Sequence, residues 1–298
     1  MNLTEATSKF LFDSGIVRTP VSRRSYRSVL SYLNSTFPVA DINDYTTKTL
    51  TSFCLLDGRS HATVAARRTA VRSLFEWCHY MKYCKTNPAA DLKFTVRSTG
   101  NKPVVVNNWL TEQQIGEMLR ACDTDDIIGQ RARVVLLIGF MTGLRRFEIA
   151  ALTWSDFSED MSRLKLIGKG EKLAVLGVPP QVREALLEWR KLAPATAVAV
   201  VPRFAGGGNI ALDTIRWNEP VNGATIHEII KGISRKSGVA MRPHDMRRSF
   251  AGILEERGVP VTDISRALRH ANVGITSTYL DKNPAKAAAL ADVFMLDL

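Results

Sequence analysis

The stretch VVLLIGFMTGLRRFE, residues 134–148, indicates how the second half of the chain folds. Its uninterrupted apolar run from Val134 to Met141 has eight residues, far fewer than the roughly 20 that a membrane-spanning helix needs. The run ends at Thr142-Gly143, and a new helical pattern begins near Arg145. With 45% hydrophobic and 23% charged residues, the composition is that of an ordinary globular protein. We therefore expect a folded chain without a membrane span.

Helical patterns predominate on both sides of this stretch. Upstream, Leu110-Thr111-Glu112-Gln113-Gln114 matches a capping box that begins a helix. Downstream, SRLKLIGKGEKLAVLGV, residues 162–178, has two β-prone runs around Gly168-Lys169-Gly170 and predicts a hairpin. We expect an irregular excursion at 201–223 and further helices at 179–193, 224–236, 244–257 and, with Thr262 as N-cap, 262–270. The predicted fold class is mainly α with a small β-sheet.

The distribution of charge and the composition of one segment predict two domains. Residues 1–100 carry 14 Lys and Arg against 7 Asp and Glu, whereas the remainder carries 26 against 22. A segment rich in Ser, Thr, Gly and Asn lies at this boundary and is typical of a linker. A chain of 298 residues is also longer than one hydrophobic core usually serves. We expect a helical domain at 1–95, a linker at 96–108 and an α+β domain at 109–298.

The net charge of +11 favours a polyanionic partner, nucleic acid first among them. TVAARRTAVRSLFEWCHYM, residues 63–81, predicts a long amphipathic helix in the basic first domain. For any single arginine there, a solvated helix face is the commoner explanation. Clustering on a basic helical domain favours contacts with the DNA backbone instead. The candidate residues form two clusters: Arg23, Arg24 and Arg27, and Arg67, Arg68 and Arg72.

The cysteines and the N-terminus bear on the cellular compartment. Cys54, Cys78, Cys84 and Cys122 form no CxxC pair and have no histidine at zinc-ligand spacing, which argues against a disulfide scaffold or structural zinc. The first residues, MNLTEATSKFLF, lack a basic region followed by an apolar core, so we expect no secretory signal. Together these features indicate a cytoplasmic protein with reduced thiols.

Several polar residues have the spacing that brings side chains to one helix face. His244 and Arg247 are three residues apart, as are Arg145 and Glu148. Two arginines can hold the nonbridging oxygens of a phosphate, and Glu148 can fix the guanidinium plane of Arg145. Tyr279 is the only tyrosine in the last 214 residues and follows a polar run. Each feature alone also fits a surface salt bridge or a packing residue, but the combination is harder to explain in that way.

In chain order, the motifs are Thr142-Gly143-Leu144-Arg145, Glu148, Lys169 between two glycines, His244-x-x-Arg247, Leu268-Arg269-His270 and Tyr279. This order resembles the tyrosine recombinase family, the phage integrases and Xer-type recombinases. The resemblance covers nearly the whole chain, and it implies a core-binding domain at 1–95 and a catalytic domain at 109–298. One departure is Arg269, because the family usually has Gly between Leu and His at the turn that leads into His270.

The resemblance implies that Tyr279 is the nucleophile, which forms a covalent 3′-phosphotyrosyl intermediate with DNA. Each of the remaining site residues binds the same phosphate, transfers a proton near it, or orients another residue of the site. The resemblance implies that Arg145 and Arg247 clamp the phosphate and that Lys169 is the acid that protonates the leaving 5′ oxygen. It implies that His244 is the base that assists Tyr279 and that His270 hydrogen-bonds the phosphate or buttresses the site. Glu148 is then the orienting carboxylate.

The resemblance also implies partners. These are double-stranded DNA at specific core sites and a homotetramer whose protomers exchange their C-terminal segments, here 285–298. No cofactor or metal is expected, since the sequence has no P-loop pattern and no cluster of metal-binding carboxylates. The need for a directionality factor stays open. Larger phage integrases add an N-terminal domain for distant arm sites, whereas here the simpler two-domain form is expected.

A site-specific recombinase of the integrase type is the leading interpretation. A Xer-type resolvase of chromosome or plasmid dimers is the close alternative. A noncatalytic DNA-binding accessory protein is a third, against which the complete set of catalytic residues argues. A type IB topoisomerase shares the chemistry but relaxes supercoils as a monomer without site preference.

Overall fold

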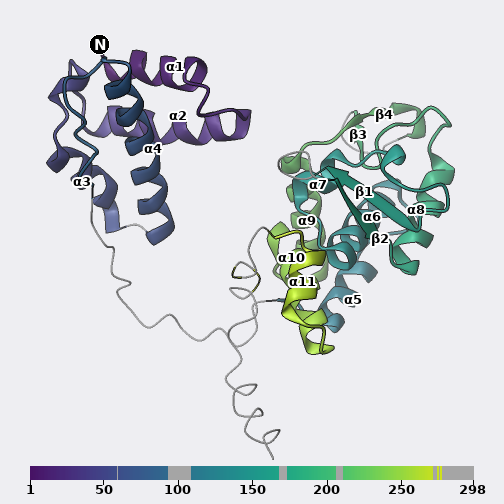
Figure 1. Ribbon diagram of the computed structural model, residues 1–298. Coiled ribbons are helices and arrows are strands. Elements are labelled where there is room, and N and C mark those ends of the chain that lie inside the picture. Colours follow the sequence, from purple (N-terminus) through teal and green to yellow (C-terminus); the bar gives the residue numbers. More distant parts are fainter. Residues whose placement is uncertain are drawn as a thin grey trace, which may run out of the picture. The chain divides into compact units, whose positions relative to one another are not determined.

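The computed structural model describes residues 1–58, 60–92, 109–167, 173–205 and 211–270, together with Gly274 and Thr276. The chain divides into two compact units, Met1–Asn101 and Lys102–Leu298. Helices predominate in both units and the strands are short (Figure 1), so the predicted fold class is confirmed. The expected linker at 96–108 and the C-terminal segment 285–298 lie outside the described residues.

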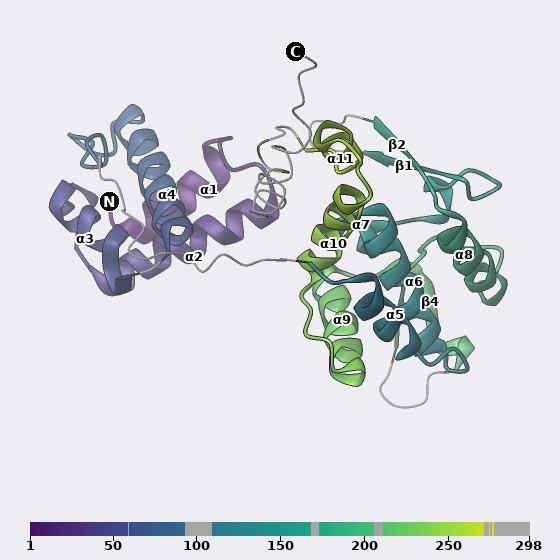
Figure 2. The same cartoon turned by 90° about the horizontal axis from the view of Figure 1, so that it is seen from below.

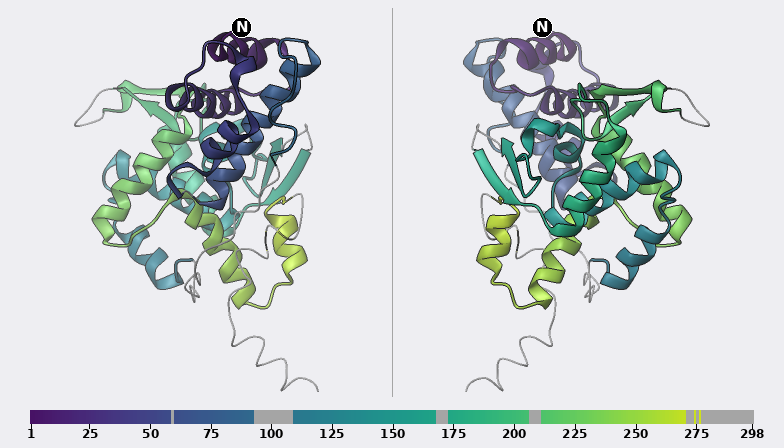
Figure 3. Two further views of the ribbon diagram at one scale, coloured as in Figure 1. Left: turned by 90° about the vertical axis from the view of Figure 1, so that its left-hand side faces the viewer. Right: turned by 90° about the vertical axis from the view of Figure 1, so that its right-hand side faces the viewer.

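The first unit is helical throughout its described part, with helices coloured purple to blue in Figure 3. Its core combines buried aliphatic and aromatic side chains, and the rings of Phe10 and Trp77 lie 5.8 Å apart. The helix predicted at 63–81 is confirmed as α4. The elements are α1 (Leu3–Asp13), α2 (Pro20–Thr36), η1 (Ile42–Asp44), α3 (Thr47–Leu55), η2 (Leu56–Gly58) and α4 (His61–Tyr80).

The apolar run quoted first lies in α6 (Ile127–Thr142), which is the central helix of the second unit. It begins earlier than the run because Asp126 caps it, accepting a hydrogen bond from the backbone N–H of Ile128 at 3.1 Å. The helix packs against α8 (Pro180–Leu192), α9 (Gly223–Ser237) and α10 (Pro243–Glu256). Contact on several sides explains why its residues are apolar around most of the circumference.

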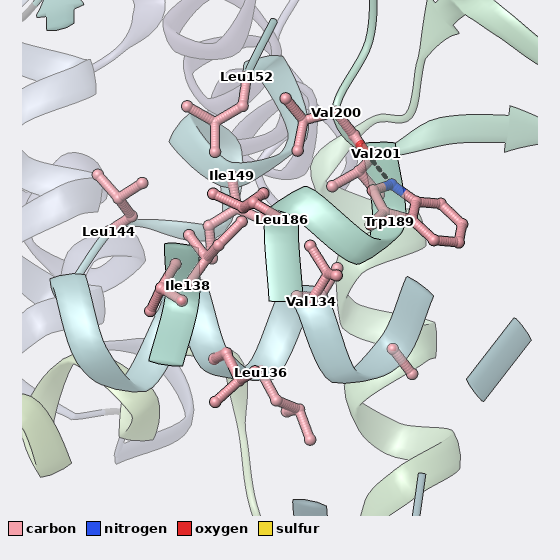
Figure 4. Close-up of a cluster of buried hydrophobic side chains, with 14 of the residues drawn as sticks. Val134, Leu136, Ile138, Leu144, Ile149, Leu152, Leu186, Trp189, Val200 and Val201 are labelled. Atoms are coloured by element: carbon pink, nitrogen blue, oxygen red, sulfur yellow. Dashed lines mark hydrogen bonds between the residues drawn. The ribbon is translucent and has the colours of Figure 1, made fainter. Parts of the chain in front are cut away.

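Figure 4 shows part of this core. Leu136 and Ile138 of α6 lie in the same cluster as Leu186 and Trp189 of α8. The indole N–H of Trp189 donates to the Val200 carbonyl at 2.8 Å, so the polar atom of this buried ring has a partner. No helix in the described part of the chain has the length and apolar character needed to span a membrane.

The predicted hairpin is confirmed as β1 (Arg163–Ile167) paired antiparallel with β2 (Leu173–Gly177), Ile167 lying opposite Leu173. The prediction of an irregular excursion at 201–223 is wrong in part. This segment includes a second antiparallel pair, β3 (Pro202–Phe204) and β4 (Ile215–Pro220). Its proline and asparagine content obscured a period of two in β4, where alternate residues Ile215 and Trp217 are buried.

The remaining helices are α5 (Glu112–Arg120), α7 (Arg146–Ala151) and α11 (Val261–Ala267). The capping box of α5 is present, with Thr111 and Gln114 satisfying each other's backbone N–H groups. Thr262 is not the N-cap of α11, because the Pro260 carbonyl already accepts from the Ile264 N–H at 3.0 Å. The helix ends before 270 since Arg269 has a left-handed φ of 55°. Figure 2 shows α11 beside α10, which it contacts.

Gly143 makes the turn between α6 and α7, and a side chain would not fit there. Its φ of +63° lies in the left-handed region. A Cβ atom built on it would come within 2.8 Å of side-chain atoms of Leu268 and Phe250. The glycine therefore lets α10 and the end of α11 approach the turn that leads into Arg145.

We predict that Gly143→Ala lowers the free energy of unfolding by about 2–4 kcal/mol, the sum of a left-handed alanine and an overpacked contact. Gly238→Ala is the matched control, because Gly238 also ends a helix with a positive φ of 74° but has nothing within 4 Å of a built Cβ. We expect it to lose only about 1–2 kcal/mol. Denaturant unfolding measures both variants, and equal losses would contradict the packing account.

Candidate active site

Three segments of the second unit meet at a buried guanidinium, that of Arg247. This residue lies on α10 and is 1% exposed. Its Nη1 donates to the Gly143 carbonyl at 2.6 Å, and its Nη2 donates to the Leu268 carbonyl. The side chain thus joins α10 to the turn before α7 and to the residues that follow α11. Arg145 follows the first of these turns, and His270 follows the second.

Arg145 and Glu148 make the contact that their spacing predicts. Nη1 of Arg145 lies 3.0 Å from Oε1 of Glu148, and the backbone N–H of Arg145 donates to Oε2 at 2.8 Å. Although burial alone raises the pKa of Glu148, the backbone hydrogen bond from Arg145 and the charges of Arg269 and Arg145 hold it below its ordinary value. An ionised Glu148 therefore orients a guanidinium that is 45% exposed and accessible to a ligand.

The pKa values of both candidate histidines lie below the ordinary value of the residue. His244 is exposed in the first turn of α10, and desolvation by its surroundings, followed by the charges of Arg248 and Arg247, lowers its pKa. Burial, followed by the charges of Arg247 and Arg145, lowers the pKa of His270 to about 4. A neutral imidazole can accept a proton, as a general base must.

The electrostatics also show that these groups form one cluster. Arg247 and Arg145 both lower the pKa of each histidine, so all four side chains lie within electrostatic reach of one another. The cluster has more positive than negative charge, with Glu148 as its bonded carboxylate. Such a site attracts an anion, and a phosphate group has the charge and oxygen atoms to fit it.

Lys169 and Tyr279 lie outside the described residues. In the sequence, Lys169 follows the end of β1 by two residues and Tyr279 follows Thr276 by three. Thr276 is described, and its Oγ1 lies 2.7 Å from Nδ1 of His270.

The structure corrects one of the predicted DNA contacts. Arg67 does not face DNA, because it is 6% exposed and its Nη1 donates to the carbonyls of Phe53 and Leu56 at 3.1 and 3.0 Å. These carbonyls lie at the C-terminal end of α3, where the helix runs out of N–H donors; that of Phe53 also accepts from the Leu56 N–H. The sequence contained the signal, since Arg67 falls between Val64 and Val71 in the apolar stripe of α4.

The other predicted arginines of the first unit lie at or near the surface. Arg24, Arg27 and Arg72 are exposed, whereas Arg23 and Arg68 are half-buried. The guanidinium carbons of Arg23 and Arg27 lie 5.2 and 5.6 Å from the ring centroid of Phe12, whose side chain is itself exposed. These positions leave room for contacts with phosphates.

One residue of the cluster was not among the predicted site residues. Arg269 pairs with Glu148, with Nη2 2.8 Å from Oε2. The two residues are 121 positions apart, and no local pattern in the sequence connects them.

Comparisons with known proteins agree on one family. A family model described as "Phage integrase family" matches residues 108–286. The tyrosine recombinase XerC of Corynebacterium glutamicum is 25% identical over 272 residues, which cover 90% of this chain and 83% of that protein. The tyrosine recombinase XerD of Listeria monocytogenes is 25% identical over 264 residues, which cover 86% and 84%.

Solved structures match in fold. A lambda integrase dimer bound to a COC′ core site superimposes with a TM-score of 0.70 at 16% identity, covering 95% of this chain and 97% of that one. The XerH recombinase bound to a palindromic difH substrate gives a TM-score of 0.68 at 19% identity, covering 92% and 80%. At such identities the likeness is one of fold.

We predict different effects for two arginines of α4. Arg72→Ala removes an exposed charge, so the slope of log affinity against log salt for a random-sequence duplex becomes shallower by about 0.9. Arg67→Met removes this buried donor from the carbonyls of Phe53 and Leu56 and lowers the free energy of unfolding by about 1–3 kcal/mol, with an unchanged salt slope. Fluorescence anisotropy and thermal unfolding of the full chain test both. A slope change for Arg67→Met as large as that for Arg72→Ala would refute the buried assignment.

We also predict a contribution of His270 to the dependence of stability on pH. Its folded pKa of about 4 lies below the ordinary 6.5, so as pH falls the unfolded chain takes up the proton first. The contribution is complete above pH 6.5 and is lost as pH falls toward 4. His270→Gln should therefore lose less stability than the wild type between pH 7 and 5, by on the order of 1 kcal/mol. Parallel stability profiles of the two proteins would argue against it.

Proposed function

The chain belongs to the phage integrase family, and on that premise we propose that it is a site-specific recombinase whose nucleophile is Tyr279. As a tyrosine recombinase, it cleaves and rejoins DNA. One observation carries the assignment of the site: Arg145, Arg247, His244 and His270 converge from three segments into one positively charged cluster. The contact of His270 with Thr276, which precedes Tyr279 by three residues in the sequence, supports the assignment of Tyr279 to the same site.

In the proposed reaction, the phenolic oxygen of Tyr279 attacks the phosphorus of the scissile phosphodiester. A bond forms between this oxygen and phosphorus, and the bond from phosphorus to the 5′ oxygen breaks. Tyrosine has a pKa near 10, so attack at neutral pH requires a proton acceptor. His244 takes the phenol proton, which the lowered pKa of its imidazole allows since the neutral form predominates.

The leaving 5′ oxygen requires a proton, and we assign its transfer to Lys169. This residue lies between two glycines in the connection of β1 to β2. A positioned general acid contributes typically ~10² to 10⁴ in rate. The phosphotyrosyl ester keeps the cleaved bond in activated form, so rejoining to a 5′-hydroxyl group requires neither a nucleotide cofactor nor a metal.

The two arginines contribute to this reaction from different positions. Arg145 is exposed and oriented by Glu148, so its guanidinium can bind nonbridging oxygens directly. Arg247 is buried and bound to two carbonyls. A phosphate reaches Arg247 only if the neighbouring chain moves when DNA binds, and otherwise Arg247 acts through its charge. In both cases positive charge stabilises the transition state more than the ground state.

We assign the first unit as the core-binding domain and the second as the catalytic domain. Exposed arginines of the first unit would hold the DNA backbone while the cluster of the second acts on one phosphate. Lambda integrase has been solved as a tetramer bound to a Holliday junction, and the matched fold supports a similar assembly here. The buried cysteines suit a cytoplasmic enzyme that acts on DNA in its bacterial host.

The role in the cell has two candidates. We favour an integrase, on the structural match to lambda integrase. The curated relatives named XerC and XerD favour a resolvase of chromosome or plasmid dimers. Mapping the positions at which the wild-type protein attaches covalently to its flanking genomic DNA separates the two, since an integrase cleaves at the ends of its own element.

We predict that Tyr279→Phe keeps DNA binding but forms no covalent adduct, because it removes the attacking oxygen and retains the ring. The assay uses a nicked duplex containing a cleavage position mapped with the wild-type protein. Tyr83→Phe is the matched control, since it makes the same change in the first unit, and it should form the adduct normally. An adduct with Tyr279→Phe would show that another nucleophile acts.

The same assay tests the acid. Lys169→Ala should slow cleavage by ~10² or more on the ordinary duplex. A duplex whose bridging 5′ oxygen is replaced by sulfur should restore the rate, because a thiolate leaves without a proton. A variant that sulfur does not rescue would exclude Lys169 as the acid.

A further inference from the structure

Arg269 is bound to the carboxylate that orients Arg145. Its Nη2 lies 2.8 Å from Oε2 of Glu148, while Oε1 of the same carboxylate lies 3.0 Å from Nη1 of Arg145. Glu148 thus bridges two guanidinium groups that come from different turns of the chain. One turn precedes α7 and the other follows α11.

The backbone of Arg269 is in a conformation that arginine rarely adopts. Its φ of 55° lies in the left-handed region, which glycine adopts without steric strain but other residues do not. A strained residue persists only when the surrounding contacts hold it there.

We propose that Arg269 is a positioning residue of the recombination reaction, which fixes Glu148 and through it the guanidinium of Arg145. The same contact joins the turn that contains His270 to the turn that contains Arg145. This inference rests on the proposed function, because Arg145 needs a fixed orientation only if it binds the scissile phosphate.

The burial of the three side chains supports this role over that of an ordinary surface ion pair. Arg269 is 14% exposed and Glu148 is 26% exposed, so the contact between them is shielded from solvent. Arg145 is the exposed member of the three, at 45%. A shielded pair beneath an exposed guanidinium restricts the rotamers of the residue that meets the ligand, and it leaves the outer face of that residue accessible.

The charges favour the same conclusion. The positive charges of Arg269 and Arg145 both help to keep Glu148 ionised. With Arg269 present, the three side chains carry a net charge of +1, whereas Arg145 and Glu148 alone would carry none, so the positive potential that a phosphate meets at Arg145 is stronger. Arg269 therefore supplies both orientation and charge.

The test compares single-turnover cleavage of the nicked duplex at saturating protein with duplex affinity and thermal stability. Arg269→Gly should cleave 10- to 100-fold more slowly, with affinity within about two-fold of the wild type, because it misplaces a group needed in the transition state. Its melting temperature should be equal or higher, since glycine relieves the backbone strain. A residue with a merely structural role would lower stability along with the rate.

Two further variants test the path through Glu148. Arg269→Lys keeps a charge and one donor, so it should recover part of the rate. Glu148→Gln combined with Arg269→Gly should be no slower than Glu148→Gln alone, because both changes remove the same support. Arg266→Ala is the control, since Arg266 is an exposed arginine of α11 paired with Asp263, and it should cleave as the wild type does.

Each other outcome overturns the inference in a distinguishable way. Unchanged cleavage by Arg269→Gly removes the positioning role. Weaker binding with an unchanged saturating rate makes Arg269 a DNA contact, and additive losses in the double variant break its link to Glu148. If the wild-type protein itself forms no adduct, the proposed function fails as well.

Discussion

The site depends on one buried hydrogen-bonded charge, the guanidinium of Arg247. A charge removed from water is costly unless hydrogen bonds replace its hydration, and the carbonyls of Gly143 and Leu268 supply such bonds. Their positions are consequently fixed with respect to α10. Arg145 follows Gly143 by two residues, and Arg269 and His270 come directly after Leu268. Arg145, Arg269 and His270 therefore lie on segments that this one side chain joins to α10.

The turns on either side of Arg247 share a second property, which is a left-handed residue. Gly143 has a φ of +63°, and Arg269 one of 55°. Gly143 adopts this left-handed φ without steric strain because it has no side chain, which also allows Leu268 to approach closely. Arg269 adopts the same unfavourable region of φ, and its side chain forms an ion pair with Glu148.

The excess of positive charge affects both anion binding and the pKa values of the histidines. Arginines on three segments create a potential that favours a phosphate. Desolvation first, and the charges of nearby arginines second, lower the pKa of His244 and of His270. An anionic group bound at the cluster would partly neutralise this potential and raise both pKa values.

The sequence alone determined the local features of this protein. It predicted α4, the capping box at Thr111, the β1–β2 hairpin and the pairing of Arg145 with Glu148, because each depends on residues a few positions apart. It also contained, in the periodicity of α4, the signal that Arg67 is buried. Ordered motifs identified the family and the candidate residues, although Lys169 and Tyr279 lie outside the described structure.

Only tertiary packing decided that Arg269 meets Glu148 across 121 residues and that Arg247 is anchored while Arg145 is exposed. Such contacts depend on how α7, α10 and α11 pack around Gly143, and no local pattern encodes the distance between segments that approach each other only in the folded chain.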